Sequence, residues 1–196
     1  MSFSIELELQ KFPKNLKLKD GRKALLRPLK ADDEKAFHQL FLDIPEPERM
    51  FIKHRVQDVK VIRDWCKNID VGRNLPLLGL VDHKVVGVAT LHQQLGGWKR
   101  HIGRVSVLVH PQFRGIGLAR GLVTEMLDIA RQASLERVEA EFIGEQEAAM
   151  NMFAMIGFSQ LARLEDYVKD MQAISHDYVL MGLDLRTDEE YAGVGG

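Results

Sequence analysis

The chain of 196 residues is long enough for one well-buried core and short for two domains, and 45% hydrophobic and 28% charged residues are typical of a globular protein. Its 27 basic and 28 acidic side chains nearly cancel, so net charge supports neither a nucleic-acid partner nor binding to a membrane surface. The single cysteine, Cys66, excludes an intrachain disulfide. We therefore expect a cytoplasmic protein with a buried, structural thiol.

Residues 1–20 predict an N-terminal arm. Ile5, Leu7 and Leu9 alternate with glutamates, which indicates a short edge strand or a segment that contacts a partner. This part contains no uninterrupted apolar run, so neither a signal peptide nor a membrane span is expected. We expect the folded domain over residues 21–186 and a flexible tail over residues 187–196.

The apolar pattern predicts the following elements in chain order. Strands are expected at residues 23–29, 75–81, 84–91, 102–109, 137–143, 158–168 and 177–185, and helices at 30–44, 58–69, 118–133 and 147–156. Three consecutive strands before the main helix argue against a doubly wound parallel sheet. The expected fold class is α/β in composition (α+β in arrangement), with a single mixed, mostly antiparallel sheet flanked by helices.

Residues 105–122 carry the clearest chemical signal. A β-branched strand leads into a Pro-bounded turn with Gly115 and Gly117, and the turn opens directly onto an amphipathic helix. Such a turn leaves backbone N–H groups unpaired at the positive end of a helix, which can bind a phosphate-bearing cofactor. A Rossmann site does not fit because Arg120 occupies the position of its third glycine, and a P-loop does not fit because no Gly-Lys-Ser/Thr follows. A purely structural turn is the remaining alternative.

The order Arg114-x-x-Gly117-x-Ala119 resembles the pyrophosphate loop of the GNAT superfamily of acyl-CoA N-acyltransferases. The resemblance covers roughly residues 23–185. It implies the GNAT fold, in which two central parallel strands, here 102–109 and 137–143, splay apart to admit the pantetheine arm of acetyl-CoA. It also implies that the pyrophosphate lies on the loop amides. The expected cofactor-binding residues are Val107, Leu108, Val109, Arg114, Gly115, Ile116, Gly117, Leu118, Ala119 and Arg120.

A second GNAT signature is similar to the segment Glu145-Gln146-x-Ala148-Ala149-x-x-x-Phe153-x-x-x-Gly157-Phe158. It adds Gln146 and Phe153 to the expected cofactor contacts. In the family, a tyrosine at the position of Phe153 often serves as the acid, and a glutamate on the central strand often serves as the base. Phe153 cannot donate a proton, and the central strand carries Arg104 and Ser106 instead. We expect Glu141 or Glu145 to act as a base through water, and Ser106 to hold that water.

No metal site is expected, because the spacing of His83, His92, His101 and His110 matches neither a helical face nor a known ligand set. The resemblance implies an N-acetyltransferase that moves the acetyl group of acetyl-CoA to a primary amine by direct attack in a ternary complex. The opening of the domain is similar to the catalytic domain of bacterial protein-lysine acetyltransferases, so the acceptor is left open between a protein lysine and a small amine. The alternative is a non-catalytic acyl-CoA-binding sensor or regulatory module. A homodimer is also left open.

Overall fold

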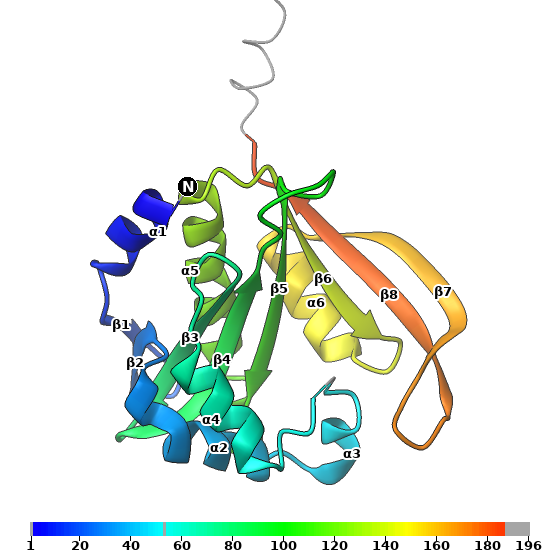
Figure 1. Cartoon of the computed structure of the whole chain (residues 1–196). Helices are drawn as coiled ribbons and strands as arrows, with labels where there is room; N and C mark the ends of the chain where they lie inside the picture. Colours follow the sequence, from blue (N-terminus) through cyan, green and yellow to red (C-terminus); the bar gives the residue numbers. More distant parts are fainter. Residues whose placement is uncertain (1, 53, 187–196) are drawn as a thin grey trace, which may run out of the picture.

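The computed structural model describes residues 2–52 and 54–186. Within these residues, eight strands form one mixed sheet in the spatial order β1-β2-β3-β4-β5-β6-β8-β7 (Figure 1). The strands are β1 (Lys14–Lys17), β2 (Lys23–Pro28), β3 (Asn74–Val81), β4 (Lys84–His92), β5 (Ile102–Val109), β6 (Arg137–Ile143), β7 (Ser159–Lys169) and β8 (Ser175–Asp184). The helices are α1 (Ser2–Leu9), α2 (Glu34–Leu42), α3 (Glu46–Arg49), α4 (Val59–Lys67), α5 (Leu118–Gln132) and α6 (Glu147–Ile156), with 3₁₀ turns η1 (Ala31–Asp33) and η2 (Pro111–Phe113). This arrangement confirms the expected fold class, and the expected tail lies outside the described residues.

The sheet divides between its two central strands. β5 and β6 are parallel and pair only at their beginnings, residues 102–104 against 137–139. β5 then keeps pairing with β4 as far as Val109, and β6 keeps pairing with β8 as far as Ile143. The two strands therefore separate toward their C-terminal ends, as expected, and we call the resulting gap the fork.

Helices cover both faces of the sheet at β3 and β4, which explains why these two strands are predominantly hydrophobic. α5 and α6 pack on one face, where Met126 is fully buried, and α2 and α4 pack on the other, around Leu40. Because successive strand residues point to opposite faces, Leu77 lies in the first cluster and Leu78 in the second. On the α2 and α4 side of the sheet, Ser106 of β5 is exposed.

The N-terminal segment differs from the expected edge strand. Residues Ser2–Leu9 form helix α1, which contacts α5, and Ile5 is only 2% exposed in the core. Ile5 and Leu9 are four residues apart and share one helix face, whereas Leu7 is 55% exposed, so the alternating pattern is equally compatible with a helix. The edge strand is instead β1, which pairs with β2.

Local turn and cap signals behave as the sequence predicts. Asp82 and His83 both have positive φ, 48° and 64°, in the two-residue turn between β3 and β4. The Asp58 carboxylate caps α4 by accepting a hydrogen bond from the Lys60 amide at 2.9 Å, and Gly157 ends α6 with φ of 114°. These residue types are the ones that such turns and helix ends favour, so short-range sequence accounts for them.

Cys66 is buried between α4 and the sheet, and burial raises the pKa of its thiol to about 11. A thiol with such a pKa carries little thiolate at neutral pH, which supports a structural role. Among the helices that the structure describes, none has both the length and the apolar character needed to cross a membrane.

Candidate active site

The glycine loop joins the end of β5 to the start of α5. After η2 the chain passes through Gly115 and Gly117, whose φ angles are +75° and +94°. Gly117 is the N-cap of α5, and no side chain caps this helix end. Because residues with a Cβ rarely adopt positive φ, the path of the loop depends on these two glycines.

The loop presents a run of backbone amides, residues 115–120, which we call the amide cradle. The Gly121 amide donates to the Gly117 carbonyl at 3.0 Å and begins the helical hydrogen bonding. Within residues 2–52 and 54–186, no protein acceptor takes a hydrogen bond from the six amides before it. Several unpaired donors at the positive end of a 15-residue helix can hold a diphosphate, so these residues fit the pyrophosphate of acetyl-CoA.

The hairpin between β1 and β2 forms one wall of the amide cradle, a relationship that the sequence did not predict. The Lys19 amide donates to the Ile116 carbonyl at 3.0 Å, and Lys19 Cγ lies 3.9 Å from the position that a Cβ on Gly117 would take. Arg22 lies over the Phe113 ring, 4.4 Å from its centroid. No carboxylate of the described chain pairs with the exposed Lys19 ammonium, which can therefore meet an anion held on the loop.

Arg114 is engaged within the protein. Its Nη1 and Nη2 donate to the two carboxylate oxygens of Glu48 at 3.0 and 2.7 Å, and its Nε donates to the Val109 carbonyl at 3.1 Å. Glu48 belongs to α3, so this ion pair joins the connection between α2 and α4 to the glycine loop. The geometry supports a bracing role for Arg114.

The remaining expected cofactor residues lie on both sides of the fork. Val107, Leu108 and Val109 form the part of β5 that has no described strand beside it on the β6 side, so an extended ligand can be added there. Along the loop and helix, Leu118 points into the core at 1% exposure, Ile116 and Ala119 are half-buried, and Arg120 is exposed.

The residues of the second signature close the far side of the fork. Gln146 Oε1 accepts a hydrogen bond from the Ile143 amide at 3.0 Å. Phe153 is 1% exposed and packs edge-on against Phe142 and Phe158, with ring centroids 5.0 and 4.9 Å away. Its expected contact with the cofactor stays a prediction.

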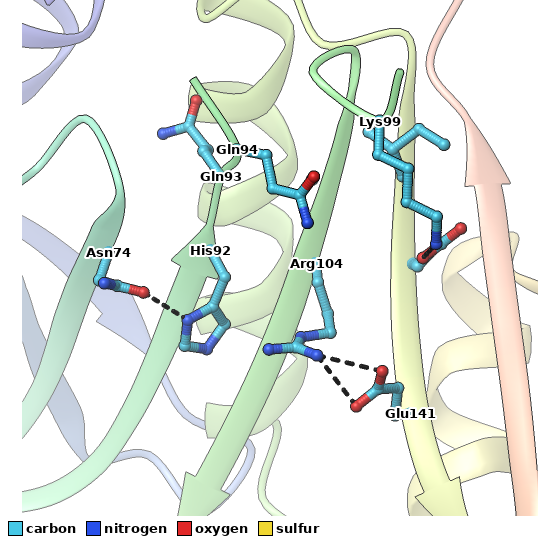
Figure 2. Close-up of a pocket in the computed structure, with 10 residues that line it drawn as sticks. Asn74, His92, Gln93, Gln94, Lys99, Arg104 and Glu141 are labelled. Atoms are coloured by element: carbon cyan, nitrogen blue, oxygen red, sulfur yellow. Dashed lines mark hydrogen bonds and ion pairs between the residues drawn. The ribbon is translucent and has the colours of Figure 1, made fainter. Parts of the chain in front are cut away.

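A polar pocket of about 270 Å³ opens at the closed end of the fork (Figure 2). Arg104 reaches from β5 to β6, where its Nη1 donates to both oxygens of Glu141 at 3.1 and 3.2 Å. Lys99 pairs with Glu139 at 3.6 Å. The polar pocket therefore contains both signs of charge, arranged in pairs.

Glu141, one of the expected bases, also lies beside Tyr178 of β8. Burial and the Glu141 carboxylate raise the pKa of Tyr178 to about 12. At neutral pH this hydroxyl keeps its proton and can donate to the carboxylate. Glu141 is therefore held by Arg104 from one side and by Tyr178 from the other.

Ser106 lies beside a histidine that the sequence analysis assigned no role. His92 Nε2 is 3.3 Å from Ser106 Oγ, and His92 Nδ1 is 2.7 Å from Asn74 Oδ1, the contact drawn in Figure 2. The three residues come from β3, β4 and β5, at sequence separations of 18 and 14 residues. No motif or spacing rule connects them, because the register of the antiparallel strands brings them together.

Glu145, the other expected base, lies in a separate cluster. Its carboxylate is 2.7 Å from His176 Nδ1, while His176 Nε2 is 3.4 Å from Asp170. The Phe51 ring packs edge-on against His176 at a centroid distance of 5.0 Å. The hydrogen bond from His176 lowers the pKa of Glu145, which makes this carboxylate a weaker base. The structure does not bring Glu141 and Glu145 together.

An amide cradle beside a forked pair of parallel strands, with a polar pocket at the closed end of the fork, fits the class of acyl-CoA-dependent acyltransferases. The chain belongs to the acetyltransferase (GNAT) family, whose model matches residues 35–158. This confirms the expected family and the acetyltransferase class.

Individual relatives agree with this assignment. The chain is 27% identical over 113 residues to the L-amino acid N-acyltransferase MnaT of Escherichia coli (strain K12), an alignment that covers 55% of this chain and 66% of that protein, slightly less than two thirds. The GNAT domain of S. lividans PAT superposes with a TM-score of 0.73 at 17% identity, covering 87% of this chain and 96% of that one. The protein yncA from Salmonella typhimurium, solved with its cofactor acetyl-CoA, superposes with a TM-score of 0.70 at 19% identity, covering 83% and 94%. The two structural likenesses show the shared fold.

Proposed function

We propose that this protein transfers the acetyl group of acetyl-CoA to the primary amine of a small polar acceptor, with L-amino acids as the acceptor class. The observation that carries the proposal is the amide cradle, whose donors have no protein partner in the described chain and which lies beside the open fork. Acetyl-CoA, when bound, supplies an acyl group activated as a thioester.

In this proposal the amide cradle holds the pyrophosphate, and Lys19 and Arg120 add positive charge. A helix end contributes only about 0.3–1 kcal/mol per charge interaction, so several donors must act together. The unpaired side of residues 107–109 holds the pantetheine arm as an added strand and directs the thioester toward the closed end of the fork.

The acceptor class is supported by the size and charge of the polar pocket. Its volume of about 270 Å³ is at the lower limit of ligand sites, which favours a small molecule over a folded protein. Arg104 and Lys99 can meet a carboxylate, and Glu139 and Glu141 can meet an ammonium, as a zwitterionic amino acid requires. The name of the relative MnaT points to the same class. A protein lysine is the other acceptor that the sequence leaves open.

We also propose a cytoplasmic location, supported by the single, buried Cys66. A homodimer stays an expectation.

A thiol-release assay with acetyl-CoA and the common L-amino acids, together with a lysine-containing peptide, tests the proposed activity. We expect CoA to raise the melting temperature and at least one amino acid to react at least about tenfold faster than the peptide. CoA binding without turnover of any amine favours the sensor, and the absence of a thermal shift makes the loop purely structural.

A further inference from the structure

We propose that His92 is the catalytic base of this acetyl transfer and that Asn74 is the positioning residue that sets its tautomer. The inference rests on the proposed function, because it assigns the group that takes the proton from the acceptor amine. It differs from the sequence-based expectation, which placed the base on Glu141 or Glu145.

The contact with Asn74 determines which nitrogen of His92 carries the proton. The Asn74 Oδ1 atom can only accept a hydrogen bond, so the Nδ1 atom at 2.7 Å must donate. A neutral ring then has its lone pair on Nε2, where the Ser106 hydroxyl lies 3.3 Å away and can donate to it. This is the tautomer that accepts a proton at Nε2.

His92 also lies where the amine and the thioester would meet. It is in register with Arg104, the last residue of β5 that pairs with β6, and it lines the polar pocket. Ser106, two residues further along β5, is the next side chain on this face and lies past the point where the strands part. The imidazole therefore borders both the pocket and the fork.

The carboxylates of the pocket are less suited to the task. Glu141 is bound by Arg104, and Glu139 is paired with Lys99 at 3.6 Å. Both carboxylates are therefore already engaged by cations of the pocket. These four side chains are the charged groups that line the pocket with His92, and their charges cancel in pairs.

The inferred step balances atoms and electrons, starting from the neutral amine. The nitrogen lone pair forms a bond to the carbonyl carbon, and the C–S bond breaks with its electron pair remaining on sulfur. Nε2 of His92 accepts the proton that leaves the nitrogen, while Nδ1–H stays hydrogen-bonded to Asn74. The imidazolium then returns its proton to the thiolate, so the products are an amide, a free thiol and the original enzyme.

Nitrogen-15 NMR of the histidine rings tests the tautomer without any acceptor, with His92→Gln used to assign the signals. In the wild-type protein we expect a neutral His92 ring protonated on Nδ1, and in Asn74→Ala we expect this preference to be lost. A wild-type ring protonated on Nε2 overturns the inference.

Steady-state kinetics test the role of His92 as catalytic base, with the amino acid that reacts fastest in the thiol-release assay as the acceptor. His92→Gln is expected to lower kcat at least about 100-fold while the KM for acetyl-CoA changes less than about twofold. Asn74→Ala is expected to lower kcat about tenfold and to shift the acidic limb of the pH profile of kcat/KM. The matched control is His83→Asn, in the exposed turn between β3 and β4, which should keep the wild-type kcat.

Three further outcomes overturn the inference, and they are distinguishable. A kcat for His92→Gln within about threefold of wild type removes the base role while the proposed function stands. An acetylated Ser106, detected by mass spectrometry after incubation with acetyl-CoA alone, replaces direct attack by a covalent route. If CoA binds and no amine reacts, the proposed function is wrong and the inference is wrong with it.

Discussion

Across the fork, one nitrogen of the Arg104 guanidinium donates to both carboxylate oxygens of Glu141, at 3.1 and 3.2 Å. Arg104 is the last residue of β5 that pairs with β6, and Glu141 lies two residues past Glu139, its partner on β6. A carboxylate that binds an arginine in this position orients the arginine at the wall of the polar pocket. This relationship predicts a positioning role for Glu141.

We therefore expect Glu141→Gln to lower kcat by less than about tenfold and to leave the acidic limb of the pH profile in place. The free energy of unfolding should fall by no more than about 1 kcal/mol, because the Arg104 and Glu141 side chains are 38% and 29% exposed and water weakens their attraction. Kinetics across the pH range and urea unfolding measure the two effects. Loss of the acidic limb would instead identify Glu141 as the base.

Gly117→Val tests the amide cradle. Gly117 has φ of +94°, so a β-branched residue there is strained by about 1–3 kcal/mol, and its Cβ would lie 3.9 Å from Lys19 Cγ, at the wall of the amide cradle. We expect the variant to fold at a lower melting temperature and to show no further stabilisation by CoA. Gly97→Val is the matched control, because Gly97 has φ of +79° and open space around it in the loop between β4 and β5. A normal CoA shift in Gly117→Val contradicts the site.

Lys19→Gln tests the contribution of the N-terminal hairpin to cofactor binding. Removal of one cation beside a diphosphate should weaken acetyl-CoA binding about two- to fivefold at low salt, and the difference should shrink as ionic strength rises. Isothermal titration calorimetry at two salt concentrations measures the Kd for acetyl-CoA of the variant and of the wild type. Lys17→Gln, an exposed lysine of β1, should bind as the wild type does. An equal loss of acetyl-CoA affinity in the two variants would mean that the net charge of the protein, and not the position of Lys19, determines the effect.

His176 predicts a pH-dependent contribution to stability. Its hydrogen bonds to Glu145 and then to Asp170 raise the pKa of His176 above 6.5, so the folded state holds this proton more tightly than the unfolded chain. The resulting stabilisation is complete below the unfolded-state pKa and is lost as the pH rises through the raised value. We expect His176→Asn to lower the melting temperature more at about pH 5.5 than at about pH 8.5. The same difference at both pH values contradicts this coupling.

Much of the framework could be read from local sequence pattern. The alternation and 3.6-residue periodicity that define β3 to α6 depend on residues close together in the chain, and so do the Asp82-His83 turn and the Asp58 cap. The same is true of the glycine loop, where strand, positive-φ turn and helix start follow one another within a few residues. Residues Ser2–Leu9 form a helix where the pattern predicts a strand, because Ile5 and Leu9 fit a strand face as well as a helix face, and the contact of α1 with α5 decides between them.

The sequence by itself thus determined the family, the mixed sheet and the glycine loop between strand and helix, because each follows from residues close together in the chain. Binding of the cofactor by this loop stays a prediction. Only the tertiary structure decided the acceptor side and the surroundings of the loop. Asn74, His92 and Ser106 meet through the pairing of three strands, and Glu48 meets Arg114 across 66 residues. Contacts of this kind depend on strand register and helix packing, which are set by burial of the whole core and leave no local pattern in the sequence.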